Sequence, residues 1–281
     1  MTIDDIAKSF VDARRGARAL PGFPGAVPSN LSESYAIQDK AIALFDRPII
    51  GWKIGRVAPD KQAEHNTERL CGPIFAPTLK AYAGEALTLP VYDGGFAAVE
   101  AEYVFRVDHD ADPDKTDYTE EEALRLIDAV FAGIEMAGSP LATINALGPT
   151  VVATDFGNNF GLVLATQLGE FDSDTTEAAL SPEAVAAFKA TTEIDGAIVG
   201  EGGLFTMPGG PLKAIAWLAG FLARRGRPLT KGQYISSGAT TGIHDIKAGS
   251  TSVVRFSGPG THTAEIRLTT VKLTEASQEL K

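Results

Sequence analysis

Hydrophobic and polar positions follow two rhythms along this chain, one typical of helices and one typical of strands. Apolar residues at helical spacing predict helices over 3–19, from Asn30 or Ser32 to about Phe45, and over 211–225. Runs of β-branched and aromatic residues predict strands over 49–55, 97–107, 233–237, 252–257 and 261–273, and a hairpin over 190–199. The pattern therefore predicts an α+β chain, with a helical N-terminal extension over 1–48 and a β-rich main domain over 49–281.

A second helix-to-strand transition is predicted near the middle of the chain. The capping box Thr119-Glu120-Glu121-Glu122 opens a helix that buries Ala123, Leu124, Ile127 and Val130. We expect a break near Asp128 and then a short buried strand over 130–138, because the two glycines of that stretch weaken a helix.

Four further segments have irregular patterns. Residues 56–72 are polar without periodicity, which is typical of a mobile lid over a site and equally of an ordinary surface loop. Residues 149–165 predict a bend and two strands, 172–182 a surface loop, and 200–203 a flexible joint. His65, in the first of these segments, is either an acid–base group or simply solvated.

The strand over 97–107 carries two glutamates on one face. Side chains alternate along a strand, so Glu100 and Glu102 share one face while Val99, Ala101 and Tyr103 share the other. Two carboxylates in an apolar setting repel one another, and a hard divalent ion such as Mg²⁺ or Mn²⁺ would neutralise them. The alternative is that this face of the sheet is simply wet.

Three other features add candidate chemistry. Glu135 is a third carboxylate within an apolar stretch, which burial alone explains poorly. Lys53 is flanked by glycines in a short apolar strand, where it either extends to an edge or is held for a purpose. The segment 238–242 (Gly-Ala-Thr-Thr-Gly) offers backbone N–H and hydroxyl donors to an anion, although such turns are also common without a ligand.

Composition narrows the functional classes. With 281 residues, 44% hydrophobic and 22% charged, the chain has the composition of an ordinary globular protein. Its net charge of −11 argues against nucleic acid and anionic membranes as partners. The single cysteine, Cys71, excludes an internal disulfide framework, and the acidic start is unlike a signal peptide, so we expect a cytoplasmic protein.

Motifs for other chemistries are missing from the sequence. We find no Gly-x-Gly-x-x-Gly element after a strand, no P-loop, no Gly-x-Ser-x-Gly elbow and no zinc-like spacing of the four histidines. Cys71 has no obvious basic partner in the sequence. The remaining candidates are Lys53, the three glutamates and the Gly/Thr-rich segment 238–242.

This ordered set resembles the fumarylacetoacetate hydrolase superfamily and, within it, the group of 2-keto-4-pentenoate hydratases and 4-oxalocrotonate decarboxylases. The resemblance extends from about residue 50 to the end of the chain, and the short helical N-terminus also fits the hydratase branch. The matching pieces are Gly51-Trp52-Lys53-Ile54-Gly55, Glu100-Ala101-Glu102, Ile134-Glu135, the turn from Asp155 to Gly161, Pro211-Leu212-Lys213-Ala214, and Ser237-Gly238-Ala239-Thr240.

The resemblance implies a fold and a site. The fold would be a β-rich mixed-sheet roll with flanking helices, in a protein that forms a dimer or a larger homo-oligomer. Glu100, Glu102 and Glu135 would hold Mg²⁺ or Mn²⁺, with Lys53 as the catalytic residue in the same cavity. We predict that Asp155, Gly238 and Thr240 bind the substrate.

Residue chemistry and resemblance agree on a metal-assisted reaction of a 2-oxo acid, in which the ion stabilises an enolate. A hydratase would convert a 2-hydroxy-2,4-dienoate into a 4-hydroxy-2-oxo acid. The alternatives are a 4-oxalocrotonate-type decarboxylase, an acylpyruvate hydrolase, or an inactive family-fold binding protein. The last is permitted because many members carry an aspartate after the Phe-Ala pair, where this chain has Pro77.

Overall fold

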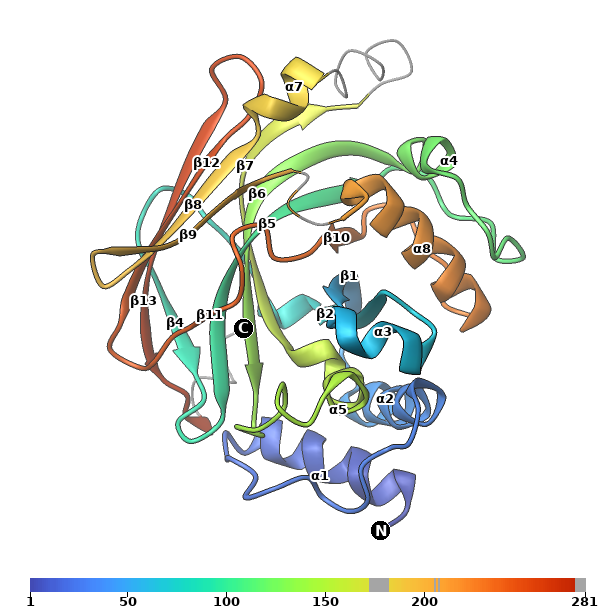
Figure 1. Cartoon of the computed structure of the whole chain (residues 1–281). Helices are drawn as coiled ribbons and strands as arrows, with labels where there is room; N and C mark the ends of the chain where they lie inside the picture. The colour runs from blue at the N-terminus through green and yellow to red at the C-terminus, as the bar shows by residue number, and fades with distance from the viewer. Residues whose placement is uncertain (172–181, 205, 207, 276–281) are drawn as a thin grey trace.

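Two twisted sheets form the body of the protein, as the computed structural model shows for residues 1–171, 182–204, 206 and 208–275 (Figure 1). In this described part the larger sheet has the strand order β2 (Arg69–Phe75), β1 (Ile49–Arg56), β10 (Tyr234–Ser236), β5 (Phe96–Val107), β6 (Ile127–Ser139), β7 (Asn159–Glu170) and β3 (Leu79–Ala81), and β11 (His244–Asp245) pairs with β5. The smaller sheet has the order β4 (Leu87–Val91), β13 (Thr263–Lys272), β12 (Thr251–Ser257), β8 (Lys189–Ile194) and β9 (Ala197–Gly203). Parallel and antiparallel pairs occur in both sheets.

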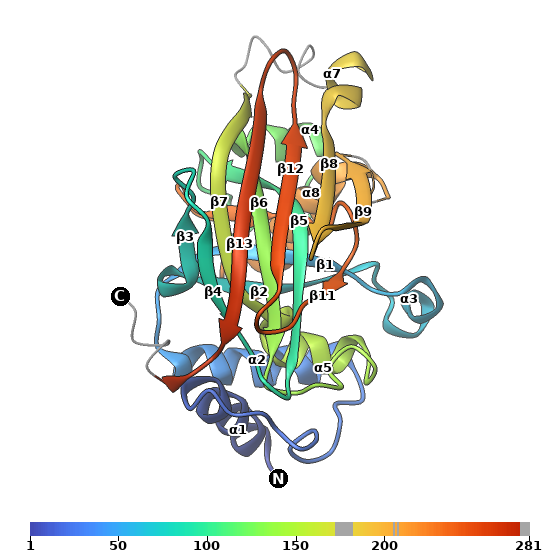
Figure 2. The ribbon, with the colours of Figure 1, turned by 90° about the vertical axis from the view of Figure 1, so that its left-hand side faces the viewer.

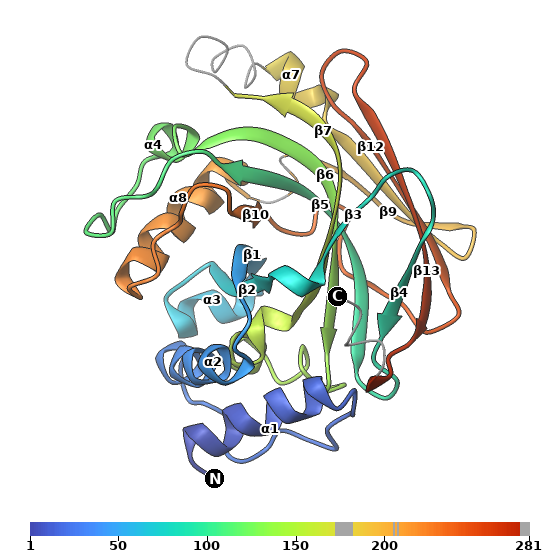
Figure 3. The same cartoon turned by 180° about the vertical axis from the view of Figure 1, so that it is seen from behind.

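Helices flank these sheets at one end and along one side. From behind, α1, α2 and α5 lie at the end where the N-terminus is found, and α8 lies beside β1 and β10 with α4 next to it (Figure 3). The described helices are α1 (Ile3–Arg15), α2 (Leu31–Phe45), α3 (Pro59–His65), α4 (Glu120–Leu124), α5 (Pro149–Thr154), α7 (Pro182–Ala187) and α8 (Gly210–Arg224), with the 3₁₀ turns η1 (Ala76–Thr78) and η2 (Phe156–Asn158).

The two faces of strand β5 lie in different environments, because side chains alternate along a strand. One face packs against the smaller sheet, which stands in front of β5, β6 and β7 in Figure 2. On this face the Tyr103 ring meets Phe188 and Phe256 edge-on, with ring centroids 5.4 and 5.6 Å apart. The other face of β5 carries Glu100 and Glu102, which are buried as well. The curvature of the larger sheet therefore covers the glutamates, and they are not exposed to solvent.

The mixed α+β class is confirmed, and so are the strongly patterned elements. Helices form close to the predicted bounds at α1, α2 and α8, and Asn30 caps α2 by accepting a hydrogen bond from the Glu33 amide at 3.0 Å. The predicted strands appear as β1, β5, β10, β12 and β13, and the predicted hairpin as β8 and β9. Both residues of its turn, Asp195 and Gly196, have positive φ, as a tight hairpin needs. The division into residues 1–48 and 49–281 stays a prediction.

Several irregular segments differ from the prediction. Residues 56–72 are not one loop, because they contain the helix α3 and the first half of β2, a strand that is buried along its whole length. Ile127 and Val130 belong to the thirteen-residue strand β6 and not to the helix before it. Residues 149–154 form the helix α5 where we expected a strand, and 200–203 belong to β9 rather than to a flexible joint. The surface loop predicted over 172–182 lies almost entirely outside the described residues.

The wrong predictions for β2 and β6 share a physical cause. Arg69 and Gly72 make β2 look polar and irregular, although Gly72 is needed there because a Cβ would lie 1.8 Å from the Phe156 carbonyl oxygen. Gly133 likewise allows β6 to continue, since a Cβ there would lie 2.5 Å from a Val104 methyl group. Tertiary packing, rather than local propensity, selects the strand in both places.

A search of the described helices for one both long and apolar enough to cross a membrane finds none.

Candidate metal centre

Three buried glutamates converge on the covered face of the larger sheet. Glu100 on β5 lies directly opposite Glu135 on β6, and Glu102 follows two residues further along β5. One carboxylate oxygen from each side chain can be chosen so that all three oxygens lie within 4.8 Å of one another. Glu100 is 3% exposed, and Glu102 and Glu135 are fully buried. The alternation of β5 and the pairing of β5 with β6 thus bring together the acids that the sequence singled out.

One oxygen of each glutamate lacks a hydrogen-bond donor. These atoms are Glu100 Oε1, Glu102 Oε1 and Glu135 Oε2, all buried. Carboxylate oxygens around Mg²⁺ at bonds of about 2.1 Å are about 3.0 Å apart when adjacent and about 4.2 Å apart when opposite. The spacing of at most 4.8 Å needs only a small inward movement to reach such a shell. The donor set therefore fits a hard divalent cation.

The electrostatics of the cluster are unfavourable without such a cation. Burial, together with the charge of Glu135, raises the pKa of Glu100 to about 8. Burial, with Glu135 and Glu100 acting in the same direction, raises the pKa of Glu102 well above its usual range. Like charges directly opposite in a sheet are destabilising. The metal-free site therefore holds protons at neutral pH, and a bound cation would displace them.

The side chain of Lys53 extends from β1 to the same cluster of glutamates. Its Nζ lies 3.4 Å from Glu135 Oε2 and donates a hydrogen bond of 3.0 Å to Asn158 Oδ1. Burial alone would lower the pKa of Lys53, but Glu135, Glu100 and Glu102 together raise it. The lysine is thus a buried cation held against the acids, and it does not extend to a wet edge.

A tight turn between α5 and β7 supplies two side chains that the sequence reasoning did not assign. Asn158 accepts from Lys53, and Asn159 Nδ2 donates to Glu135 Oε1 at 3.0 Å. Phe156, Gly157 and Asn158 all have φ between 54° and 63°, in the left-handed region. For a bulky residue such as Phe156 this conformation costs energy, and such strain is concentrated at functional sites. The only signal in the sequence was the Gly-Asn-Asn run itself, which predicted a turn or a close approach to a ligand.

The N-terminal helix holds this turn in place. Arg14 on α1 forms a buried ion pair with Asp155, with Nε and Oδ1 2.6 Å apart, and it donates to the carbonyl oxygens of Asn159 and Gly138. Ser139 Oγ donates to the other Asp155 oxygen at 2.6 Å. Both oxygens of Asp155 are therefore engaged by the protein, and these contacts support a structural task. Its predicted role in substrate binding stays a prediction.

The loop after β10 holds Glu102. Ser236 Oγ and the Gly238 amide both donate to Glu102 Oε2, the latter at 2.9 Å. Gly238 therefore binds the glutamate in this structure, and its predicted contact with substrate stays a prediction. Thr240 is buried, its amide donates to the Ala101 carbonyl oxygen at 2.8 Å, and we find no partner for its hydroxyl within the described ranges. Ser236, which sequence reasoning missed, carries no motif beyond its place before the Gly/Thr segment.

Three other residues of interest lie apart from the glutamates. His65 ends α3 and has only a 3.9 Å contact with its neighbour Glu64. Pro77 is part of η1 and is exposed. Cys71 does have a basic neighbour, because Arg225 lies 4.0 Å from its sulfur, but burial raises the pKa of the thiol to about 11. A thiol with so high a pKa is unreactive at neutral pH.

Two known hydratases are similar to this chain over most of its length. No family model matches the chain. A "TodF product hydratase" of Pseudomonas putida is 28% identical over 240 residues, which cover 84% of each chain. A "2-keto-4-pentenoate hydratase" of Paraburkholderia xenovorans is 26% identical over 263 residues, which cover 92% of each chain.

Solved structures show the same fold. A 4-oxalocrotonate decarboxylase from Pseudomonas putida, complexed with magnesium and adipate, superposes with a TM-score of 0.73 at 17% identity and covers 96% of this chain and 97% of its own. A fumarylpyruvate hydrolase from Pseudomonas aeruginosa, in complex with Mn²⁺ and pyruvate, gives a TM-score of 0.54 at 12% identity over 81% of this chain and 91% of its own.

Proposed function

We propose that this chain is a member of the fumarylacetoacetate hydrolase superfamily and, within it, a divalent-metal-dependent hydratase. Its substrate would be a 2-hydroxy-2,4-dienoate of the 2-keto-4-pentenoate type, and its product a 4-hydroxy-2-oxo acid. The observation that carries the proposal is the meeting of three buried carboxylate oxygens that accept no hydrogen bond, one of which, Glu135 Oε2, lies 3.4 Å from Nζ of the buried Lys53. The hydratase names of the relatives at 26–28% identity support this reaction over its alternatives.

In this proposal Glu100, Glu102 and Glu135 hold Mg²⁺ or Mn²⁺ through the three oxygens that lack donors. When bound, the ion would supply a Lewis acid that stabilises negative charge on the keto oxygen of a 2-oxo acid. In two of these glutamates the second carboxylate oxygen already accepts hydrogen bonds from the protein. Ser236 and Gly238 donate to Glu102 Oε2, and Asn159 donates to Glu135 Oε1. The protein therefore orients the ligand oxygens before any ion arrives.

Lys53 is the proposed acid–base residue. It is the cation that contacts the acid cluster in the described part of the chain, and its pKa is raised by them, so the ammonium form is available to donate. From this position it would exchange protons with C3 or C5 of the dienoate, while water adds to C4. Asn158 orients its Nζ. Thr240, a buried residue whose hydroxyl forms no hydrogen bond within the described part of the chain, is the proposed partner of the substrate carboxylate, and Gly238 and Asp155 would support that contact through the residues they hold.

The decarboxylase and hydrolase alternatives would use the same acids and the same lysine. The inactive-protein alternative rested on Pro77, but this residue lies on η1, outside the contacts of the glutamates and Lys53. The fold likeness to the decarboxylase, at 17% identity, bears on architecture alone. We also propose a homo-oligomer, which sedimentation velocity would test.

A direct assay separates these reactions. Purified protein with Mg²⁺ would be given the dienoate, 4-oxalocrotonate and an acylpyruvate separately, and substrate loss would be followed by ultraviolet absorbance. We expect turnover of the dienoate, abolished by chelation and restored by Mg²⁺ or Mn²⁺. Faster turnover of either other substrate would reassign the reaction, and background rates with all three would favour a binding protein.

A matched pair of variants connects the assay to the site. Lys53→Met removes the proposed proton carrier and should lower kcat by about 10² to 10⁴, whereas Lys189→Met, at an exposed position on β8, should leave it unchanged. If Lys53→Met turned over the dienoate at the normal rate, its acid–base role would be wrong.

A further inference from the structure

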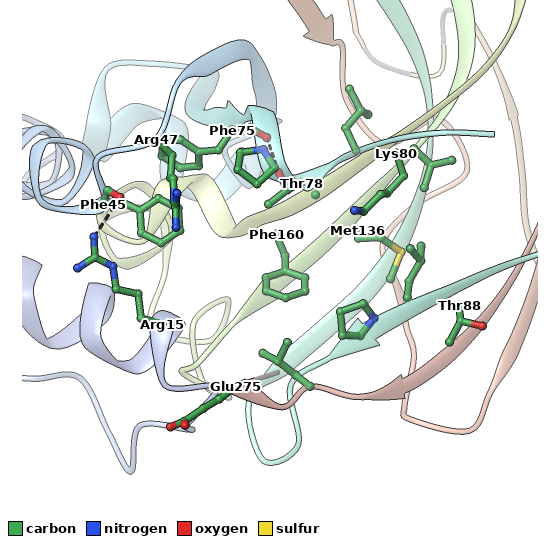
Figure 4. Close-up of a pocket in the computed structure, with 17 residues that line it drawn as sticks. Arg15, Phe45, Arg47, Phe75, Thr78, Lys80, Thr88, Met136, Phe160 and Glu275 are labelled. Atoms are coloured by element: carbon green, nitrogen blue, oxygen red, sulfur yellow. Dashed lines mark hydrogen bonds between the residues drawn. The ribbon is translucent and has the colours of Figure 1, made fainter. Parts of the chain in front are cut away.

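A cavity lies on the face of β6 opposite the three glutamates. Its volume is about 380 Å³, within the range of about 300–1,000 Å³ typical of small-molecule pockets. Figure 4 shows its wall, which is largely apolar and comes from α2, β2, β4, β6, β7 and the end of β13. Residues that form this apolar part include Phe45, Phe75, Met136, Phe160, Pro90 and Leu273.

This cavity is separate from the metal centre. Met136 lines it, whereas the preceding residue on β6, Glu135, belongs to the acid cluster. Consecutive side chains of a strand point to opposite faces, so the sheet itself divides the two spaces. None of the three glutamates and no atom of Lys53 belongs to the cavity wall. A ligand here would not touch the catalytic groups.

Positive charge gathers on this wall. Arg15, Arg47 and Lys80 line the cavity, against one acid, Glu275. Within the described residues, Arg47 and Lys80 form no hydrogen bond or ion pair, and no ion pair joins Glu275 to any of the three cations. Arg15 donates to the carbonyl oxygens of Leu44 and Phe45. In Figure 4 the Lys80 side chain reaches toward the centre of the cavity, over Met136.

Such a wall suits one class of ligand. The protein has a net charge of −11 and repels anions over most of its surface, so two partnerless cations around an apolar hollow form a local exception. An aromatic body would pack among Phe45, Phe75 and Phe160, and an anionic group would reach Lys80 or Arg47. A second copy of the chain would be expected to bury a broad face rather than to fill a hollow of this size.

We propose that this cavity binds a small aromatic carboxylate, with its ring among the phenylalanines and its carboxylate on Lys80 and Arg47. The site goes beyond the proposed hydratase activity and does not depend on it. It would be a second, non-catalytic ligand site in the same chain.

The test uses 2-naphthoate as the probe and isothermal titration calorimetry of the full chain. Saturating Mg²⁺ and oxalate are present throughout to occupy the metal centre. We expect one site per chain for 2-naphthoate, at least about tenfold tighter than for the neutral 2-naphthamide, since a hydrogen bond to a charged group contributes that much. The double variant Arg47→Gln/Lys80→Met should bind 2-naphthoate at least about tenfold more weakly. Both residues are at least partly exposed, so their replacement should leave the fold intact.

The control is Lys189→Met, which removes an exposed lysine outside the cavity and should bind as the wild type does. The proposal is overturned by any of three results: no saturable binding, equal affinity in the double variant, or equal affinity for 2-naphthoate and 2-naphthamide. Absence of binding together with a sedimentation mass above one chain would instead assign this face to contact between copies. A chain inactive as a hydratase would still bind 2-naphthoate, so the two proposals fail separately.

Discussion

Glu102→Gln should stabilise the metal-free protein and destabilise it relative to the wild type once Mg²⁺ is added. The amide oxygen can still accept from Ser236 and Gly238, while the amide NH₂ replaces the Oε1 that has no donor. The substitution thus replaces a carboxyl group, which the metal-free fold must protonate, by a permanently neutral group of almost the same volume. The sign of the effect therefore reports on charge rather than on packing.

The magnitude follows from the cluster geometry. Two unit charges 4.8 Å apart repel by about 3.5 kcal/mol at an effective dielectric constant of about 20. The protein avoids most of this by keeping a proton, because the pKa of Glu102 is raised well above its usual value of 4.5. That proton must be taken up on folding at neutral pH, and the uptake costs free energy because the glutamate of the unfolded chain is ionised there. The repulsion sets the scale of the effect, a gain of about 3 kcal/mol for Gln at neutral pH.

Proton linkage determines how the stability difference between Glu102→Gln and the wild type changes with pH. A glutamate whose pKa is raised in the folded state contributes its full stability below the pKa of the unfolded chain and loses it as the pH rises toward the folded pKa. The advantage of Gln should therefore vanish near pH 4.5 and grow as the pH rises toward the raised pKa of Glu102. Mg²⁺ reverses the order, because it binds the folded wild type and stabilises it by mass action.

The assay is urea unfolding at pH 5, 7 and 8, with chelator or with Mg²⁺, and calorimetric titration of Mg²⁺ into each protein. Glu201→Gln, at an exposed position on β9, is the matched control and should change neither quantity. We expect Mg²⁺ affinity to fall at least about 100-fold in Glu102→Gln. Equal destabilisation of the variant with and without metal, or unchanged Mg²⁺ affinity, would refute the charge argument.

Three further changes test other parts of the site. Lys53→Met should lower kcat by about 10² to 10⁴ with Mg²⁺ affinity retained, measured by absorbance kinetics and calorimetry; an unaltered kcat would contradict the proposal. Ser236→Ala removes one donor to Glu102 and should weaken Mg²⁺ binding by about 10-fold, with Ser236→Thr as the conservative control. Arg14→Met leaves Asp155 buried without its ion pair and should lower the free energy of unfolding by about 3–5 kcal/mol in urea; a loss under 1 kcal/mol would show that the pair is dispensable.

The pattern of the sequence predicted the core of this site because each step obeys a local rule. The alternation of β5 places Glu100 and Glu102 on one face, and the apolar setting of Glu135 indicated a buried acid. Lys53 stood out as a charge within an apolar strand. Whether these glutamates and Lys53 meet in one site depends on how the strands pair. The sequence indicated that pairing only through the family resemblance.

The other contacts of the site join segments that are far apart in the sequence. Arg14 reaches Asp155 across 141 positions, and Ser236 reaches Glu102 across 134. No periodicity carries such information, because each partner looks like an ordinary polar residue of its own element. The same holds for β2, whose glycine and arginine look like loop residues until the turn at Phe156 is placed against them.

Two unfavourable features of the fold support a bound cation when they are considered together. The left-handed turn at Phe156 brings Asn158 to Lys53 and Asn159 to Glu135, and a relaxed turn would not be expected to present both amides in the same direction. The donors on Glu102 and Glu135 occupy one oxygen of each and leave the other oxygen without a hydrogen bond, 3.4 Å from Lys53 Nζ in the case of Glu135. If the acids needed only neutralisation, protonation would serve and the strained turn would be unnecessary. The turn is accounted for if its task is to fix the direction of oxygens that a divalent ion then joins.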